Sequence, residues 1–596
     1  MNRLRSLWVL ATLACATCLP STWAQEPGGA APEPPQEERG LVVSREGAFE
    51  GYTLFSPLRS TSTYLVDMQG EVVHEWRNAY APGNSVYLLD NGNLLRCSRE
   101  QRNPVFHGGG QGGRIQELRW DGAVLWDYLV SDETRMHHHD AEPLPNGNVL
   151  IIVWERRTPE QALAVGRDAD RISDDGIWPD AILEIEPDRS VQGADAGRIV
   201  WEWHAWDHLV QDRDPSKPNY ADIAERPERI DINADHRYRG EPSREDDAAE
   251  RERLEQMRQL GYVGDDEDED EEDADDDGHD RRTGPDWLHT NSVAYLAEHD
   301  LIAISVREMS EVWILDHSTT TAEAATSRGG RFGRGGDLLA RFGNPQNHGA
   351  GDAGDRRLFV QHDARFVSMD DGSLHVTVFN NGRGRPAGDY STVDEFALPF
   401  DPERGFHMAP LNPVRTYRAS DPTSFYSSFI SGAERLPNGN TLICSGAEGR
   451  VFEINGRDEI VWEYLNPFGG EVALGGGPGG RGRGGPPRGR RPEGRDGPRS
   501  APGERQGGGP PGRGPGDGPG GRGAERGGPP PGGPDRPGGP GGPGGPGGRG
   551  RPGGGPDGGP DQGPGQGPGN MIPKGLFRAS RIAPDHPGLA LLQRDE

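Results

Sequence analysis

The chain has 596 residues and a formal net charge of −31 at pH 7, and it contains 91 glycines, 53 prolines and four cysteines. The acidic residues and the glycines and prolines are concentrated in two segments that have almost no apolar residues to bury. The chain therefore has fewer folded domains than its length suggests. Four cysteines exclude a disulfide-built scaffold. Roughly 400 patterned residues remain, which is enough for one large all-β domain.

The N-terminus has the pattern of a secretory signal peptide. Arg3 and Arg5 precede an apolar run over residues 7–19, and a cleavage site follows before Gln25. The apolar run is too short to span a bilayer, and no other stretch approaches the ~20 apolar residues that a membrane helix needs. We predict a signal peptide over residues 1–24 and a periplasmic or secreted protein. A lipoprotein processed at Cys15 is the weaker alternative.

Cleavage would leave two cysteines, Cys97 and Cys444, each at the same distance after an Asn-Gly pair. Equivalent positions in different repeats normally lie beyond the ~5.5 Å Cα separation of a disulfide. We therefore expect two small buried side chains and no disulfide bond.

An internal repeat carries the fold prediction. One half of the repeat is an Asn-Gly pair between apolar runs, a pattern typical of a two-residue type I′ hairpin. The other half alternates aromatic and acidic residues, as a strand with one buried face does. Four strands per unit predict a β-propeller blade. The first half occurs at Leu89–Leu95, Leu144–Leu150 and Leu436–Leu442, and the second at Val72–Trp76, Val124–Tyr128, Ile199–Trp203 and Ile460–Tyr464.

Six blades account best for the repeats, with five or seven blades and an open stack as alternatives. Five inner hairpins begin near Asn84, His139, His289, His362 and Ser428. The segment after Met571 would complete a sixth blade by pairing with the N-terminal strands around Leu41–Leu54. The fold class is an all-β six-bladed propeller formed by residues 40–204, 286–468 and 570–596.

Two insertions interrupt the propeller. Residues 205–285 contain a stretch of helical composition, Glu241–Leu260, which a glycine ends, and then an acidic run over residues 265–277. The run resembles the start of a calcium loop, but its twelfth position is Gly284, so a solvated acidic loop is the better interpretation. Residues 469–569 are rich in Gly, Pro and Arg, and we expect a disordered spacer.

Histidines recur just before the hairpin turns. His139, His289 and His362 lie seven to nine residues before their turns, which predicts that they share one register and converge on the propeller axis. Arg307 ends the strand pair that begins at His289; its alternative role is a surface salt bridge with Glu308 or Glu311. With Asn291, these side chains form a nitrogen-rich site suited to a sulfuryl or phosphoryl group.

These residues resemble the arylsulfotransferase family. The matching segments are His138–Asp140, Asp286–Ser292, Ile304–Arg307, Gln361–Asp363 and Val378–Gly382. The resemblance implies an exported six-bladed propeller that moves a sulfuryl group from one phenol to another through a sulfohistidine, without a nucleotide donor or any other cofactor or metal. Its partners would be a small-molecule aryl sulfate and a phenol, with no nucleic acid and no membrane.

The resemblance also implies residue roles. His362 would be the nucleophile, and His139, His289, Asn291 and Arg307 would hold the sulfate group. Near the fifth hairpin the family has a Lys-Thr pair, whereas this chain has Tyr426, Ser427 and Ser428. Ser428 could replace the threonine as a substrate-binding hydroxyl; the lysine charge has no substitute.

Two other functional classes stay open at this stage. The histidines could bind a metal, as in a propeller hydrolase or lyase. Alternatively, the chain is a non-catalytic scaffold that displays its acidic and Gly-rich segments. The acidic insertion directly precedes the His289 segment, so it could cover the mouth of the channel.

Overall fold

The computed structural model describes residues 39–100, 103–234, 253, 255–260, 262, 284–370, 372–406, 412–469 and 574–594. These residues belong to one compact unit. The predicted signal peptide, acidic run, calcium-loop alternative and Gly/Pro/Arg spacer lie outside the described residues.

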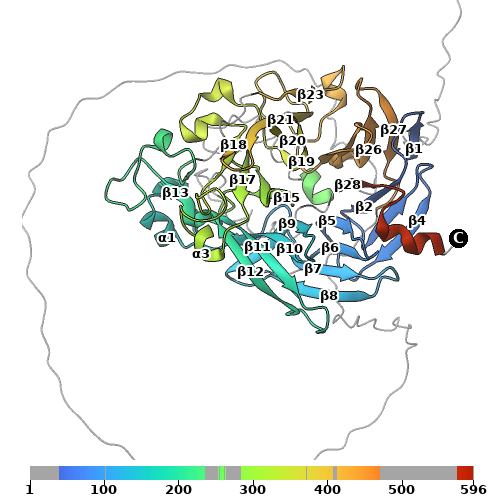
Figure 1. Ribbon diagram of the computed structural model, residues 1–596, viewed down its shortest axis with the longest axis horizontal. Helices are drawn as coiled ribbons and strands as arrows, with labels where there is room; N and C mark the ends of the chain where they lie inside the picture. Colours follow the sequence, from blue (N-terminus) through green and yellow to red (C-terminus); the bar gives the residue numbers. More distant parts are fainter. Residues whose placement is uncertain are drawn as a thin grey trace, which may run out of the picture. The chain divides into compact units, whose positions relative to one another are not determined.

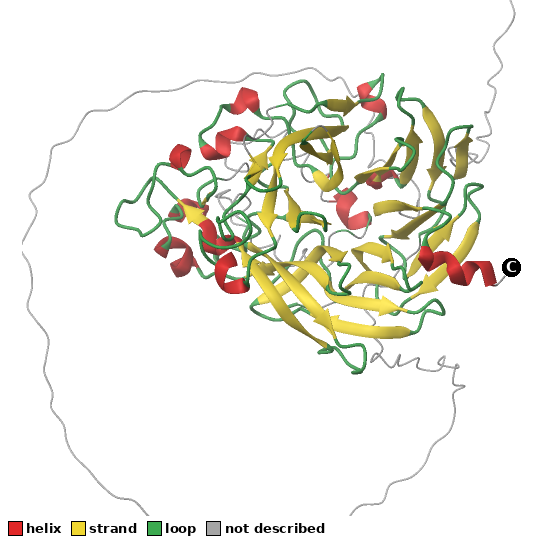
Figure 2. Ribbon diagram, viewed as in Figure 1, coloured by secondary structure: helices red, strands yellow, loops and turns green. Residues whose placement is uncertain are grey.

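Six antiparallel sheets follow one another around a common axis, as the ribbon shows (Figures 1 and 2). We number them as blades 1 to 6 and give the strands of each from the axis outwards. Blade 1 consists of β28 (Leu576–Ile582), β2 (Tyr52–Pro57), β3 (Ser62–Val66) and β4 (Val72–Arg77); blade 2 of β5 (Pro82–Leu88), β6 (Leu94–Arg99), β7 (Gly113–Leu118) and β8 (Val124–Leu129); blade 3 of β9 (Arg135–Pro143), β10 (Val149–Glu155), β11 (Asp180–Pro187) and β12 (Gly197–His204).

The remaining blades follow the same order, with additions at the outer edges of blades 5 and 6. Blade 4 consists of β15 (Thr290–Leu296), β16 (Leu301–Val306), β17 (Glu311–Asp316) and β18 (Ala340–Phe342); blade 5 of β19 (His362–Asp370), β20 (Ser373–Asn380) and β21 (Thr392–Asp401), with β22 (Gly405–Phe406) and β23 (Arg415–Tyr417) both on β21; blade 6 of β24 (Gly432–Arg435), β25 (Thr441–Ser445), β26 (Arg450–Ile454), β27 (Ile460–Leu465) and β1 (Gly40–Ser44). The six-bladed prediction is confirmed.

Short elements decorate this ring. Strands β13 (Leu209–Val210) and β14 (Ile230–Asp231) pair in parallel outside the blades. The short helices are α1 (Pro159–Ala164), α3 (Thr321–Ala324) and the 3-10 turns η1 (Ala169–Arg171), η2 (Ala205–His208), η3 (Ile223–Glu225), η6 (Pro345–His348), η7 (Ala353–Asp355), η8 (Pro422–Ser424), η9 (Gly446–Glu448) and η10 (Pro587–Arg594). Among the described residues, none of the helices is long and apolar enough to cross a membrane.

The Asn-Gly hairpins differ from the prediction in turn type. In the first of them, the N–H of Leu89 donates to Asn93 O and the N–H of Gly92 donates to Leu89 O, so the loop has three residues. Gly92 has φ +82°, whereas Asn91 is not among the residues with positive φ. This is a type I turn followed by a left-handed glycine, and the type I′ prediction is wrong. The same bonds form at Leu144 and Leu436, because the Asn side chain accepts the N–H two residues on and fixes the type I turn.

The ring closes through both ends of the chain. Strand β28 pairs with β2, as predicted for the segment after Met571. Strand β1, which we expected beside it, pairs instead with β27 at the outer edge of blade 6. The N-terminus and the C-terminal strand therefore secure two neighbouring blades.

A buried arginine of the closing strand joins three other blades at the axis. Arg578 donates from Nη1 to Asp140 Oδ2 at 2.7 Å and from Nη2 to the backbone oxygen of Asn291 at 2.9 Å. Its Nε lies 3.0 Å from Asp363 Oδ1. The guanidinium is 7% exposed and the two carboxylates are almost fully buried. Each buried charge has its partner, as burial in a low-dielectric interior requires.

Both cysteines are free and buried, as predicted. Cys97 lies on β6 and Cys444 on β25, and burial raises the pKa of the Cys97 thiol to about 12. Two such thiols act as small hydrophobic side chains of their blades.

We expect Arg578→Met to lower the free energy of unfolding by about 3–5 kcal/mol, because it leaves the buried Asp140 without its ion pair and Asp363 with Arg365 alone. Denaturant unfolding measures this loss. The control is Arg198→Met, at an arginine whose side chain is 74% exposed beside Glu186, where the loss should stay below about 1 kcal/mol. Equal losses in the two variants would contradict the role of Arg578.

Candidate functional site

The predicted site residues come from the axial ends of the inner strands, and inter-blade hydrogen bonds fix their register. The N–H of Val293 donates to Asp140 Oδ2 at 3.1 Å, that of Ala364 to Ser292 Oγ at 3.0 Å, and that of Ala433 to Asp363 Oδ2 at 3.0 Å. Each bond joins an inner strand to the next one around the axis. Asp140, Ser292 and Asp363 are therefore equivalent positions.

This register corrects the sequence prediction. The residues directly before the three equivalent positions are His139, Asn291 and His362, so these three share one register. The equivalent of His139 in blade 4 is therefore Asn291, and His289 lies two residues before it. The chain reaches the axis at left-handed residues: φ is +57° at His139 and +50° at His289. Such backbone is uncommon outside glycine and tends to occur where a site is held in a fixed geometry.

His362 is fully buried and both ring nitrogens have partners. Nδ1 contacts Asn381 Oδ1 at 2.7 Å, and the amide nitrogen of Asn381 donates to the backbone oxygens of Ser427 and Ile430. Asn381 must therefore accept, so Nδ1 carries the hydrogen and Nε2 keeps its lone pair. The N–H of Ile430 donates to Nε2 at 3.2 Å. Burial, with the charge of Arg307 adding to it, holds the pKa of His362 well below its usual value of 6.5.

Ile430 itself has unusual backbone. Its φ is +51°, which is a strained conformation for a β-branched residue, and Ser431 after it has φ +89°. The strain turns the N–H of Ile430 towards His362 Nε2. Asn381 and Ile430 together fix the tautomer and the orientation of the imidazole.

His139 belongs to a chain of contacts that starts at a buried carboxylate. His138 Nε2 lies 3.3 Å from Asp180 Oδ1, without the alignment of a hydrogen bond. His138 Nδ1 and His139 Nδ1 are 2.7 Å apart, and His139 Nε2 is 2.6 Å from the hydroxyl of Tyr262. Burial lowers the pKa of His139 well below 6.5, and the nearby His289 and His138 add to this effect. If Asp180 keeps the His138 hydrogen on Nε2, His139 donates from Nδ1 and accepts from the phenol at Nε2.

His289 packs against His139, with the two rings 4.5 Å apart. Its Nδ1 pairs with the carboxylate of Asp286. Its Nε2 is buried and has no hydrogen-bond partner among the described residues. This nitrogen is the one predicted imidazole atom in the described part of the chain that is left for a ligand.

Asn291 and Arg307 complete the predicted set. Asn291 donates to the backbone oxygen of Gln361 at 2.8 Å, and its buried Oδ1 has no partner among the described residues. Arg307 is 7% exposed and pairs with Glu308. The partner is the one named in the alternative interpretation, but the pair is buried beside the histidines, not on the surface. Glu311 pairs instead with Arg341.

Ser428 lies apart from these contacts. The hydroxyls buried in this loop are those of Ser427 and Ser431, which bond to each other at 2.8 Å and to backbone groups of the same blade. Ser428 is half-buried. Its role as a substrate-binding hydroxyl stays a prediction.

The insertion contributes a residue that the sequence analysis did not select. Residues 255–259 are helical and Leu260 follows as a turn, in agreement with the predicted helix end. Tyr262 then enters the site, and its side chain is buried at 1% exposure. Its hydroxyl contacts His139, and its ring packs on Phe429 at 5.5 Å. The described part of the insertion thus contacts His139.

Two glycines make room for these rings. A Cβ on Gly109 would lie 2.5 Å from the ring of Tyr262, and one on Gly110 would lie 2.1 Å from that of His139. Gly110 also has φ +84°, so any side chain there is disfavoured twice over. The Gly-Gly pair could have been found in the sequence, but the pattern does not show which rings it would face.

A metal site receives no support from the geometry of the described residues. No three His, Cys, Asp or Glu side chains in them are arranged to hold a metal ion. Both nitrogens of His362 and of His139 already contact protein groups.

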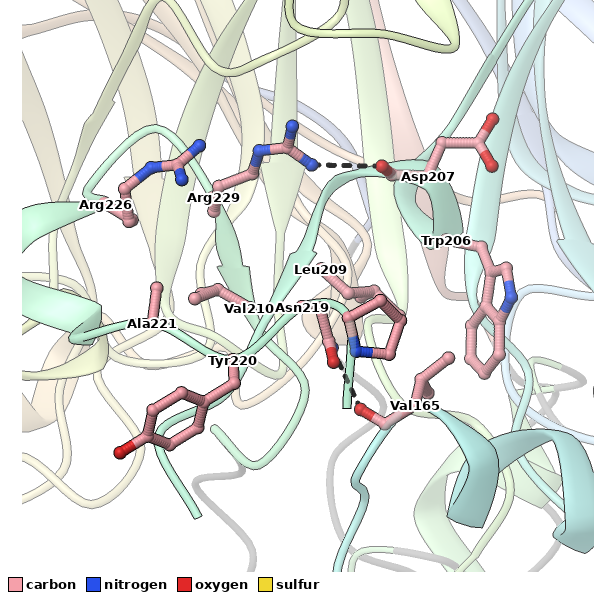
Figure 3. A pocket seen from close by; sticks show the side chains of 11 residues that line it. Val165, Trp206, Asp207, Leu209, Val210, Asn219, Tyr220, Ala221, Arg226 and Arg229 are labelled. Atoms are coloured by element: carbon pink, nitrogen blue, oxygen red, sulfur yellow. Dashed lines mark hydrogen bonds between the residues drawn. The ribbon is translucent and has the colours of Figure 1, made fainter. Parts of the chain in front are cut away.

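A separate cavity of about 280 Å³ lies outside the blades, and Figure 3 shows its lining. Trp206, Leu209 and Tyr220 line it together with Arg226 and Arg229. Arg229 donates to the backbone oxygen of Asp207 and pairs with Asp337. The cavity contains none of the predicted site residues.

We expect His362 and His139 to stay neutral as the pH falls through 6.5, because a lowered pKa means that the imidazolium forms only at more acidic pH. Nitrogen chemical shifts of ¹⁵N-labelled histidine measure charge and tautomer, and His362 should carry its hydrogen on Nδ1. His317 is the control: burial lowers its pKa, but the hydrogen bonds that its ring donates to the carboxylates of Asp300 and Glu184 outweigh burial and raise the pKa to about 9, so it should be cationic at pH 7. A His362 titration near 6.5 would contradict the buried, neutral imidazole.

Comparison with known proteins gives the same family as the motifs. The family model of arylsulfotransferase (ASST) matches residues 53–463, more than half of the chain. No curated protein sequence matches this chain.

Solved structures show only distant similarity. A Bacteroides caccae protein of unknown function is 11% identical over 70% of this chain and 93% of its own, with a TM-score of 0.34. The periplasmic gluconolactonase of Pseudomonas aeruginosa is 12% identical over 70% and 96%, with a TM-score of 0.33. Similarity at this level carries no argument about chemistry. The family model spans blades 2 to 5 in full, blade 1 apart from β28, and blade 6 as far as β27. It includes every predicted site residue, and the chain belongs to the arylsulfotransferase family.

Proposed function

We propose that this chain transfers a sulfuryl group from an aryl sulfate to a phenol through a sulfohistidine at His362, without a nucleotide donor. One observation carries the proposal. His362 is a buried imidazole whose tautomer puts a lone pair on Nε2, since Asn381 accepts from Nδ1. That lone pair accepts a backbone N–H, that of Ile430, at 3.2 Å, and this hydrogen bond passes to a sulfuryl oxygen when Nε2 attacks. A neutral imidazole with a defined lone pair is a competent nucleophile.

In the first step, Nε2 of His362 attacks the sulfur of the aryl sulfate. The N–S bond forms as the bond from sulfur to the phenolic oxygen breaks, and the departing phenolate takes a proton. That proton comes from solvent. In the second step, the acceptor phenol attacks the sulfur, the N–S bond breaks, and the electron pair returns to His362.

The sulfuryl oxygens need fixed donors during both steps. The N–H of Ile430 lies beside Nε2 of His362, and the charge of Arg307 acts on both His362 and His139. Transfer of such a group chiefly requires positioning and positive donors, as in phosphoryl transfer. Arg307 therefore has the role of charge donor, and the N–H of Ile430 that of a fixed backbone donor.

The acceptor must lose a proton, and His139 is suited to take it. With its Nδ1 hydrogen donated towards His138, Nε2 of His139 is a base that already accepts a phenolic hydroxyl, that of Tyr262. His138 and Asp180 then orient the base and stabilise the charge that it gains. The same arrangement would serve an external phenol.

The substrates would be small aromatic molecules. Aromatic side chains border the histidines: Phe577 lies 6.0 Å from the ring of His139, and Phe429 packs on Tyr262. Phenol rings pack favourably on such surfaces. If residues 1–24 act as a signal peptide, the reaction takes place in the periplasm or outside the cell.

Replacing His362 with alanine should abolish release of the donor phenol, with a loss of at least about 10³-fold, since removal of a covalent nucleophile acts on that scale. The assay uses mature protein, a chromogenic aryl sulfate and an acceptor phenol without nucleotide. His375→Gln is the matched control, because His375 pairs with Glu395 on the same hairpin and outside the site. Full activity in His362→Ala would overturn the nucleophile, and no turnover by the unaltered protein would favour a non-catalytic scaffold.

Replacing Arg307 with methionine should lower kcat/KM by about 10²–10³-fold, the usual effect of removing one transition-state donor. The methylene stem and its packing are kept, but Glu308 loses its buried ion pair with Arg307 and the variant is less stable. The rate is therefore measured at a temperature at which circular dichroism shows the variant to be folded. Arg307→Lys should recover part of the rate, since it restores the charge but not the fork of N–H groups. An unchanged kcat/KM in Arg307→Met would show that Arg307 serves only its pair with Glu308.

A further inference from the structure

Tyr262 brings a phenol into a site whose proposed reaction uses phenols. The hydroxyl lies 2.6 Å from Nε2 of His139, the nitrogen proposed above as the base for the acceptor. Figures 1 and 2 show the short helical turn before it, residues 255–259, near the axis of the ring of blades. Tyr262 therefore occupies the position that an acceptor phenol needs.

Residues from several separate segments hold Tyr262 in place. Its backbone oxygen accepts from Arg99 Nη2 at 3.3 Å and from the N–H of Gly110 at 3.4 Å. Gly109 leaves the space for its ring. A buried apolar cluster anchors the helical turn that carries it; its members are Leu58, Met257, Leu260, Tyr262, Phe429, Ile430 and Phe577.

The same cluster reaches the proposed nucleophile. Phe429 packs on the Tyr262 ring, and the next residue, Ile430, donates its N–H to His362 Nε2. The charge of Arg307 acts on Tyr262, His139 and His362 alike. The phenol, its base, the nucleophile and the charged donor thus belong to one buried cluster of interacting side chains.

We propose that Tyr262 is an internal acceptor, so that the protein sulfates itself at this tyrosine. The inference rests on the proposed function and names one acceptor for that site. After His362 has taken the sulfuryl group from an aryl sulfate, the Tyr262 oxygen attacks the sulfur. The O–S bond forms, the N–S bond of sulfo-His362 breaks with its electron pair returning to Nε2, and the phenolic proton moves to Nε2 of His139.

This step completes an exchange in which an aryl sulfate and Tyr262 become a free phenol and tyrosine sulfate. No oxidant, metal or nucleotide is needed. Burial raises the pKa of Tyr262, so the hydroxyl is protonated before the reaction and depends on His139 for activation. The donor and the product are both phenolic sulfate esters, so the free-energy change of the transfer is small.

The test incubates the mature chain with excess chromogenic aryl sulfate and no external acceptor. The unaltered protein should release two equivalents of donor phenol in its initial burst, one as His362 is first sulfated and one as a second donor sulfates His362 again after Tyr262 has taken the first group. Tyr262→Phe keeps the ring on Phe429 and should release one equivalent. Peptide mass spectrometry should find the mass of one SO₃ group on the peptide that contains Tyr262, and none on it in His362→Ala.

Tyr220 provides the matched control, since it is a tyrosine with 47% of its surface exposed, outside the histidine site. It should carry no SO₃. Equal modification of Tyr220, or modification of Tyr262 in His362→Ala, would overturn the proposed route. Turnover with an external phenol but no SO₃ on Tyr262 would overturn the internal acceptor while leaving the proposed function intact. No donor cleavage even with an external phenol would overturn both.

Discussion

The site depends on one charged contact at the propeller axis, the guanidinium of Arg578 between two carboxylates. Asp140 and Asp363 directly follow His139 and His362, so the contact that joins the blades also fixes the two histidines. The same carboxylates accept backbone N–H groups from the next inner strands. A buried charge without its partner is costly, and this cost ties the register of three blades to one another. The chemistry of the channel and the closure of the ring thus rest on the same residues.

Much of the fold was predictable because the repeat is local. An Asn-Gly pair with alternating flanks marks each hairpin within a few residues, and six units account for the ring. The turn type was wrong because the Asn side chain, not the backbone preference of the pair, decides it. The shared register of the histidines was wrong by two residues at His289, since bulges near the axis change the spacing between a turn and the channel. The number of residues between a histidine and its turn does not determine where the histidine lies in the channel. The hydrogen bonds between neighbouring blades determine that position.

The site was predictable in its residue types and not in its connections. The family motif contains His139, His289, Asn291, Arg307 and His362, and the structure brings all five to the axial end of blades 3 to 5. Tyr262 could not be found this way, because it lies in an insertion whose path to the channel depends on an apolar cluster from separate segments. Its hydroxyl lies 2.6 Å from Nε2 of His139, the contact on which the proposed internal acceptor rests. Neutral histidines follow from the same burial: a dry pocket disfavours imidazolium and leaves lone pairs for attack and for proton transfer.

The position of the closing strand, β28, in the sequence determines when the ring can close. Strand β27 ends at Leu465 and β28 begins at Leu576, so Arg578 is made after the strands of the other five blades. Until then, Asp140 lacks its ion pair and Asp363 has Arg365 alone. The entropic cost of closing so long a connection grows only slowly with its length. The channel is therefore completed only after β28 has been made, and a chain that ends before β28 would carry every histidine of the motif without a completed site.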